Sequence, residues 1–289
     1  MSLGLPSFKE MLRKFLNRIF KLFEQTQSSD SDFINSLFRC TSELIRTYAI
    51  YQDLSEIQIK TLVQIINTHI PKYAVQSNAL QCLRSVIHRR FVCADLYDLI
   101  EQQVQEMMVF NITPSIRGIC SSIFVQFLLD YPLENERIEE HLNFVLKNLA
   151  CKRMEGRIQL LEILKTLIEK LPKNVVDLYC ELLFFTLLLR AVNDEHTECR
   201  VKVLQVMRSL VFSKKISQSK VKTLLSTVLQ MGTAEENKRE LLQLAKLNAL
   251  QLLAEGGAES SNKLKGPEIC SILQSAYQDG IVSEVESLQ

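Results

Sequence analysis

The chain has 289 residues, of which 47% are hydrophobic, and this is enough apolar side chain to bury a large core and to argue against wholesale disorder. Its 8 glycines and 6 prolines are too few for a turn-rich β sandwich or a glycine-dependent nucleotide-binding fold. The formal net charge of +1 favours neither nucleic acid nor membrane as a global partner, so a charge-driven partner needs a local patch.

The first helix predicted along the chain, residues 6–25, is basic and amphipathic. Lys14 and Arg18 alternate there with Phe15 and Ile19, a pattern also found in membrane-surface helices and organelle presequences. We favour the first helix of a repeat array with an exposed basic side. The longest uncharged apolar run, residues 182–189, is far too short to span a bilayer, so we expect no membrane partner.

Apolar residues at helical spacing continue along almost the whole chain. Leu160, Leu164, Leu167 and Ile168, for example, form one stripe, and Pro172 ends that helix. The predicted helices cover residues 6–25, 30–50, 55–70, 74–90, 94–109, 114–130, 135–149, 155–170, 174–191, 196–212, 217–231 and 235–254. We expect a flexible loop at 255–266, then a short helix from 267 to about 278 and a tail to residue 289.

A repeat emerges when these helices are paired. Four second helices open with a polar turn followed by an arginine, namely Arg117, Arg157, Arg200 and Arg239, at intervals of 40, 43 and 39 residues. Asn78 holds the equivalent place 39 residues before Arg117. Paired helices repeating about every 40 residues are typical of HEAT-type arrays. We therefore predict an all-α, HEAT/armadillo-like α-solenoid of about six helical hairpins over residues 1–254.

The four arginines are interpreted as structural residues. A guanidinium in the first turn of an inner helix can reach an acceptor in the turn of the neighbouring repeat. Such contacts would form a ladder that holds the hairpins in register.

Catalytic and metal-binding patterns are weak in this sequence. The eight cysteines are scattered without a CxxC pair, which argues against zinc and for a reducing compartment. His196 and Cys199 could share a helix face as a nucleophile pair, but no oxyanion hole or orienting third group accompanies them. We predict no catalytic residues, no cofactor, no metal and no small-molecule substrate.

Basic residues gather where predicted second helices end. In a stacked array these ends share an edge, so the cations could follow a phosphate backbone or bind a partner. Cations are also favoured at helix C-termini for purely structural reasons, the acidic segment 130–136 interrupts the edge, and no interleaved aromatics offer base stacking. The candidate RNA- or partner-binding edge consists of Arg84, His88, Arg89, Arg90, Lys170, Lys173, Lys214 and Lys215.

Several longer motifs carry a family resemblance. They are FLLDYPL at 127–133, HLNFVLKNL at 141–149, EGR at 155–157, and VND with CR between 192 and 200, preceded by VQSNALQCLRSVIHRRF and DLYDLIEQQVQEMMV within 75–109. This run, about residues 75–212, resembles an interior segment of the U3 small-nucleolar-RNA-associated protein 20 family, a HEAT-repeat component of the small-subunit processome. Members of that family are many times longer than this chain.

The resemblance implies a non-enzymatic scaffold for pre-ribosome assembly and small-subunit rRNA processing. It implies a nuclear, nucleolar location and, as partners, other pre-ribosomal proteins, with pre-rRNA or small nucleolar RNA as further candidates. The family has no catalytic residues to transfer. The alternative is a generic HEAT-repeat adaptor in nuclear transport or complex assembly, and an enzyme is a formal third class.

Overall fold

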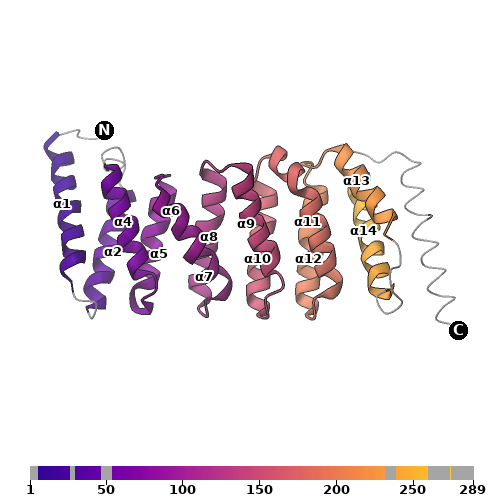
Figure 1. The fold of residues 1–289 in the computed structure, drawn as a ribbon, viewed down its shortest axis with the longest axis horizontal. Helices are drawn as coiled ribbons and strands as arrows, with labels where there is room; N and C mark the ends of the chain where they lie inside the picture. Colours follow the sequence, from indigo (N-terminus) through magenta and orange to yellow (C-terminus); the bar gives the residue numbers. More distant parts are fainter. Residues whose placement is uncertain (1–5, 27–29, 47–53, 232–238, 260–273, 275–289) are drawn as a thin grey trace. The chain divides into compact units, whose positions relative to one another are not determined.

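Helices make up every regular element that the structure describes. The computed structural model describes residues 6–26, 30–46, 54–231, 239–259 and 274, and these segments form six helical hairpins (Figure 1). The predicted all-α, HEAT/armadillo-like α-solenoid class is confirmed. The chain divides into two compact units, unit 1 at residues 1–134 and unit 2 at residues 135–289. One array over residues 1–254 would involve both units together and stays a prediction.

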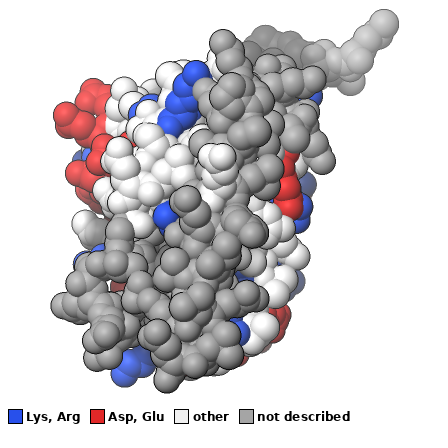
Figure 2. Space-filling model, turned by 90° about the vertical axis from the view of Figure 1, so that its right-hand side faces the viewer, with Lys and Arg blue, Asp and Glu red and all other residues white. Residues whose placement is uncertain are grey.

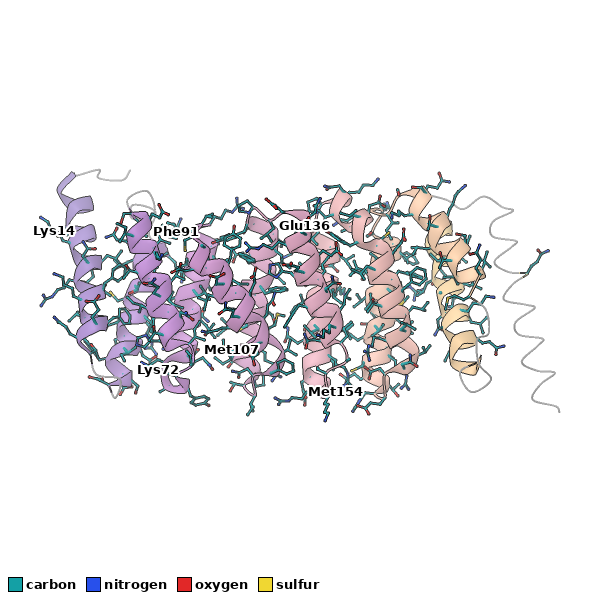
Figure 3. The ribbon with its side chains drawn as sticks, in the orientation of Figure 1. Lys14, Lys72, Phe91, Met107, Glu136 and Met154 are labelled. Atoms are coloured by element: carbon teal, nitrogen blue, oxygen red, sulfur yellow. The ribbon has the colours of Figure 1, made fainter. Side chains whose placement is uncertain are left out.

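Unit 1 contains three of these hairpins, arranged in two layers. Their elements are α1 (Pro6–Gln25) and α2 (Ser31–Arg46), α4 (Glu56–His69) and α5 (Tyr73–His88), and α6 (Ala94–Leu99), η1 (Ile100–Val104) and α7 (Gln105–Phe110) with α8 (Pro114–Asp130). The second helices α2, α5 and α8 pack on one another in chain order, and α1, α4 and α6 form the other layer. Lys72, before α5, and Phe91, after it, lie at opposite edges (Figure 3).

Unit 2 repeats this plan. Its hairpins are α9 (Asn135–Asn148) with α10 (Met154–Lys170), α11 (Lys173–Asn193) with α12 (Thr197–Phe212), and α13 (Gln218–Leu229) with α14 (Arg239–Glu259). The second helices α10, α12 and α14 stack, while α11 contacts both α9 and α13. Each stack buries the apolar stripe that one hairpin alone would leave in water.

Capping residues explain several boundaries. Ser55 begins α4 through a capping box, in which Gln58 N–H donates to Ser55 Oγ at 3.3 Å and Ser55 N–H donates to Gln58 Oε1 at 3.1 Å. Pro114 occupies the first turn of α8, where its missing N–H costs nothing. These local signals account for the close agreement between predicted and observed helix positions.

The first helix packs as part of the repeat structure. Leu16, Ile19 and Phe23 are buried, and the Phe23 ring lies 4.8 Å from that of Phe38 on α2. Phe15 is exposed on the other side. The interpretation of residues 6–25 as a repeat helix therefore agrees with the contacts of α1.

A wide π-helical turn interrupts the helix predicted at 94–109. Buried residues recur there at a spacing of four, at Leu96, Ile100, Val104 and Met108. Four exceeds the 3.6 residues of an α-helical turn, so the apolar stripe would drift around a regular helix. The wider turn at Ile100–Val104 returns the later residues to the buried face.

The predicted loop at 255–266 starts too early. α14 continues to Glu259, so residues 255–259 are helical, whereas residues 260–266 and nearly all of the predicted 267–278 helix lie outside the described residues. The glycine pair at 256–257 had indicated the loop. Gly256 instead faces α12, where an added Cβ would collide with the side chain of Val211, so glycine permits close helix packing here.

Leu164 tests whether consecutive hairpins share a core. It is fully buried and borders a cavity of about 10 Å³ with Leu142 and Leu183. We expect Leu164→Ala to lower the free energy of unfolding by about 2–5 kcal/mol, because it enlarges a void that the neighbours cannot fill. Urea unfolding followed by far-ultraviolet circular dichroism measures this loss. The exposed neighbour gives the control Lys165→Ala, and a loss below about 0.5 kcal/mol in Leu164→Ala would contradict the packing.

Candidate functional site

The structure places the eight residues of the predicted basic edge in two groups. Arg84, His88, Arg89 and Arg90 lie at the end of α5 in unit 1. In unit 2, Lys170 ends α10, Lys173 begins α11, and Lys214 and Lys215 follow the end of α12. Each group is therefore considered within its own unit. Their side chains have different roles.

Arg89 caps the preceding second helix of unit 1. Its Nε donates to Ile45 O at 3.1 Å, and its terminal nitrogen donates to Arg46 O. The last carbonyls of a helix have no partner within that helix. The guanidinium supplies donors and a positive charge at the negative end of α2.

Lys215 has the same role in unit 2. Its Nζ donates to Ile168 O at 2.8 Å, Glu169 O at 2.6 Å and Leu171 O at 2.8 Å, all at the end of α10. Arg89 and Lys215 each lie 44 residues after one of the carbonyls they contact, Ile45 and Leu171. The stacked repeats thus place a capping cation at the same relative position in both units.

Arg90 and Lys214 end their helices in the left-handed region, each with φ of 57°. This is a common way to stop a helix, although glycine usually occupies the position. Arg90 forms an ion pair with Asp130, with 2.6 Å between the terminal guanidinium nitrogen and Oδ1. Lys214 is exposed.

These contacts give part of the predicted edge a structural role, and its binding role stays a prediction. Arg89 and Lys215 hold helix ends, because stacking brings unsatisfied carbonyls within their reach, and Arg90 is paired with a carboxylate. The exposed members are Arg84, His88, Arg90, Lys170, Lys173 and Lys214, of which Arg90 is ion-paired. Charge reversal at Arg89 or Lys215 would destabilise the fold, so those two positions cannot test RNA binding.

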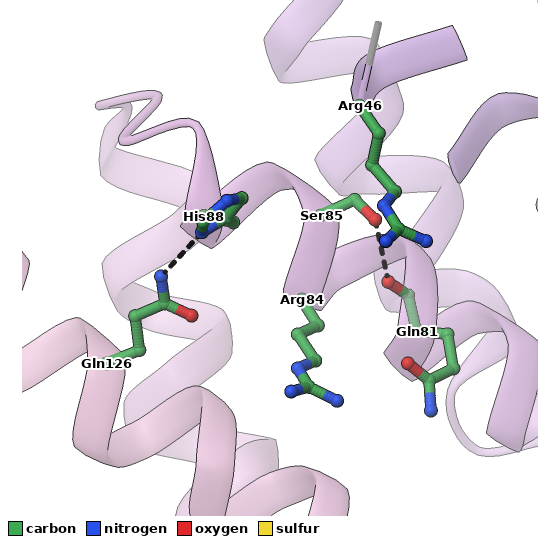
Figure 4. A pocket seen from close by; sticks show the side chains of 6 residues that line it. All are labelled: Arg46, Gln81, Arg84, Ser85, His88 and Gln126. Atoms are coloured by element: carbon green, nitrogen blue, oxygen red, sulfur yellow. Dashed lines mark hydrogen bonds between the residues drawn. The ribbon is translucent and has the colours of Figure 1, made fainter. Parts of the chain in front are cut away.

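Arg84 and His88 line a polar hollow of about 260 Å³ between the second helices of unit 1. They lie one turn apart on α5 and therefore share a face. Arg46 enters from the end of α2 and Gln126 from α8, while Gln81 and Ser85 complete the lining (Figure 4). No sequence pattern groups Arg46 with α5, because only the stacking of the helices brings them together.

Hydrogen bonds orient two groups of the hollow. The Gln126 side-chain amide donates to His88 Nδ1 at 3.1 Å. Since an amide nitrogen only donates, Nδ1 is the acceptor and the ring proton lies on Nε2. Ser85 Oγ donates to the backbone carbonyl of Gln81 at 3.2 Å (Figure 4). The Gln81 side chain takes no part in this bond and lines the hollow.

The predicted arginine ladder differs from the observed contacts. Arg117 donates to Asn111 O at 2.9 Å and Arg200 donates to Asp194 O at 2.6 Å, so each binds the turn of its own hairpin, six residues back. Arg157 makes this same contact with Cys151 O at 2.7 Å. The Arg239 side chain lies outside the described part of the structure. The first-turn arginine mainly closes its own turn, whose carbonyls are nearer than those of the next repeat.

Arg157 alone of the three described arginines also reaches the next repeat. Its Nε lies 2.9 Å from Asp194 Oδ2 and its terminal nitrogen donates to Asp194 Oδ1 at 3.1 Å. Both side chains are 5% exposed. Burial opposes the charged guanidinium, yet contacts with Cys199 and Asp194 raise the Arg157 pKa overall. This buried ion pair, with one hydrogen bond from the terminal nitrogen, joins the turns of two successive hairpins in unit 2.

Asn78, which occupies the position of the first-turn arginine in α5, makes contacts between repeats in unit 1. Asn78 donates from Nδ2 to Asn35 Oδ1 at 2.7 Å, and Asn35 donates to Ala74 O at 3.1 Å. Amide side chains therefore link α2 to the start of α5 without an arginine.

The His196–Cys199 pair shows a structural environment. Arg157 donates to His196 Nδ1 at 2.8 Å, and Cys199 is fully buried. Burial is the main cause that raises the Cys199 pKa, so the thiol form is favoured over the nucleophilic thiolate. This environment is unsuited to nucleophilic catalysis.

Other chemistry finds little support in the described segments. Within them, no group of three or more His, Cys, Asp or Glu side chains is placed to hold a metal ion. None of the described helices combines the length and apolar character needed to cross a membrane. On the face shown in Figure 2, acidic and basic side chains of described residues are interspersed. Because the formal net charge of the chain is only +1, charge-driven binding would need a local cluster such as the hollow.

Histidine burial adds a pH-dependent term to the stability of unit 2. His141 on α9 is 2% exposed. Burial, followed by the charge of Arg137, lowers its pKa to about 4. The neutral ring is therefore the form that the folded chain stabilises.

The described helices define an α-helical repeat protein with a polar, cation-lined hollow in unit 1. No protein-family model matches the chain. It is 25% identical over 202 residues to U3 small nucleolar RNA-associated protein 20 of Schizosaccharomyces pombe, covering 69% of this chain and 8% of that protein. It is 24% identical over 197 residues to the protein of the same name from Saccharomyces cerevisiae, covering 67% of this chain and 8% of that protein.

The chain thus resembles a segment of U3 small nucleolar RNA-associated protein 20 and spans 8% of the length of these two relatives. Among solved structures, a designed armadillo repeat protein aligns with 81% of this chain and 99% of its own, at 12% identity and a TM-score of 0.40.

Lys215 and its neighbour provide a direct test of the capping contacts. We expect Lys215→Met to lower the free energy of unfolding by about 1–2 kcal/mol, because three carbonyls at the end of α10 lose a charged donor. Lys214→Met removes the same charge from an exposed position and should change stability by less than about 0.5 kcal/mol. Urea unfolding compares the two variants, and equal losses would contradict the capping role.

His141 should make unit 2 less stable in mild acid. Its folded pKa of about 4 lies below the usual unfolded value of about 6.5. The stabilisation is complete above the unfolded pKa and is lost progressively as pH falls toward the folded pKa. At about pH 5 the loss should approach about 2 kcal/mol relative to neutral pH. Urea unfolding at both pH values measures it, and His141→Gln, which cannot titrate, should show a smaller difference between them.

Proposed function

We propose that this chain is a non-enzymatic helical-repeat scaffold of the small-subunit processome, acting in pre-ribosome assembly and small-subunit rRNA processing. The observation that carries the proposal is the match of about two thirds of the chain to U3 small nucleolar RNA-associated protein 20 in two yeasts. The stacked hairpins support it, because helical repeats offer extended surfaces that bind partners without a catalytic centre.

The proposed partners are other pre-ribosomal proteins and pre-rRNA or small nucleolar RNA, and the proposed location is the nucleolus. The family name of the relatives supports both. Exposed basic residues supply candidate contact points, with Arg84, His88 and Arg90 in unit 1 and Lys170, Lys173 and Lys214 in unit 2. Neither unit needs the other for its own cations to contact a partner.

Gradient sedimentation tests the scaffold role. A tagged chain expressed in its own cells should sediment with small-subunit pre-ribosomes and colocalise with a nucleolar marker. Depletion should raise the level of unprocessed small-subunit rRNA precursors and leave large-subunit rRNA unchanged. A chain confined to the cytosol and to the light gradient fractions would contradict the proposal.

The gradient also needs a control for non-specific association. The Leu164→Ala variant retains the surface charges but should weaken the stacked core, so at a temperature where it unfolds it should leave the heavy fractions. A pulldown with a small GTPase or a signal peptide tests the alternative, a nuclear-transport adaptor. That alternative predicts that the chain binds one of them.

A further inference from the structure

The hollow in unit 1 has the chemistry of an anion site. Among its six lining residues, two are arginines, one is a histidine and none is acidic. Arg46, Arg84 and His88 are all exposed, so a ligand can reach them from solvent. Gln81 adds an amide, which can donate to phosphate oxygens without adding charge, whereas the Gln126 amide already donates to His88 Nδ1 and Asp130 Oδ2 and orients the site.

Nearby negative groups are already neutralised. Asp130 pairs with Arg90 at 2.6 Å and accepts from Gln126 at 3.4 Å. The carbonyl end of α2, which would otherwise repel an anion, is capped by Arg89. The contacts of Arg89 and Arg90 with these groups thus make the hollow more favourable to negative charge.

One acidic residue competes for a cation of the hollow. Glu43 lies 3.3 Å from Arg46, one turn earlier on α2, with side chains 74% and 63% exposed. An exposed pair of this kind contributes little to stability. A phosphate that also contacts Arg84 can therefore displace Glu43 at small cost.

The shape of the hollow favours a phosphodiester backbone over a small metabolite. Its lining comes from α2, α5 and α8, three successive second helices, and it is open to solvent. A strand can cross such a site from one helix to the next, whereas an enclosed ligand site would cover most of its ligand. No aromatic ring lines it except the imidazole of His88, so base stacking is not the main source of affinity.

We propose that the hollow formed by Arg46, Arg84 and His88 with Gln81 and Gln126 binds the phosphate backbone of RNA, with little preference for base sequence. The guanidiniums contact successive phosphate oxygens, and His88 donates from Nε2. The inference builds on the proposed function, because the pre-ribosomal particle supplies the RNA.

Fluorescence anisotropy with a labelled, mixed-sequence single-stranded RNA tests the site in the full chain. Arg46→Gln combined with Arg84→Gln should weaken binding about tenfold or more, because two charged donors are lost. The slope of log affinity against log salt should fall by about 1.4, or about 0.7 for each lost contact with single-stranded RNA. Arg89 should still cap α2 in this variant, since it binds the backbone oxygens of Ile45 and Arg46.

Lys147→Gln combined with Lys165→Gln is the matched control. Both lysines are exposed and lie outside the hollow, so the net charge falls by the same amount. This variant should change the affinity less than about twofold. Equal weakening in the two double variants would show diffuse attraction and overturn the site.

Two further outcomes would also overturn the inference. One is the absence of RNA binding by the unaltered chain, and the other is polyglutamate of matched length binding as tightly as RNA, which would indicate an acidic protein partner.

Urea unfolding checks the stability of both double variants, and their free energies of unfolding should equal that of the unaltered chain. If the chain sediments with pre-ribosomes but fails to bind RNA, the scaffold function stands without this site. If the chain binds RNA through the hollow but never sediments with pre-ribosomes, the scaffold function is wrong and the RNA site stands.

Discussion

The stacking of second helices is the constraint on which the other features of each unit depend. α5 packs between α2 and α8, and α12 packs between α10 and α14. Burying the apolar stripes in this way brings the ends of successive helices together. Their last carbonyls then need donors from the neighbouring repeat, because an unpaired buried carbonyl is costly. Arg89 and Lys215 are these donors.

This structural demand separates cations that look alike in sequence. Arg89 and Arg90 are adjacent, as are Lys214 and Lys215, yet one of each pair caps a helix. The other residue of each pair, Arg90 or Lys214, has φ of 57° and does not cap that helix. Arg84 lies one turn earlier on α5, beyond reach of the carbonyls, and remains at the surface with His88. Position relative to the helix end therefore decides which cations cap a neighbouring helix.

The sequence predicted the hairpins well because periodicity, Pro114 and Pro172 act locally. The own-turn contacts of Arg117, Arg157 and Arg200 were misjudged, although the constant distance of six residues to the turn was a readable signal. The spacing of four residues between apolar positions from Leu96 to Met108 was likewise a readable signal of the π-helical turn. Arg46 could not be assigned to the hollow from sequence, since 38 residues separate it from Arg84 and stacking geometry alone unites them.

Arg89 couples the stack to the proposed phosphate site. The same guanidinium that holds the end of α2 also cancels the negative end of the α2 dipole beside the hollow. An anion at Arg46 and Arg84 therefore meets a lower electrostatic cost when the stack is closed than when it is loosened. Because coupling of this kind is reciprocal, a phosphate in the hollow should in turn favour the closed stack of α2 on α5. A repeat that gains stability from its ligand in this way suits a scaffold, whose shape is best fixed when its partner is in place.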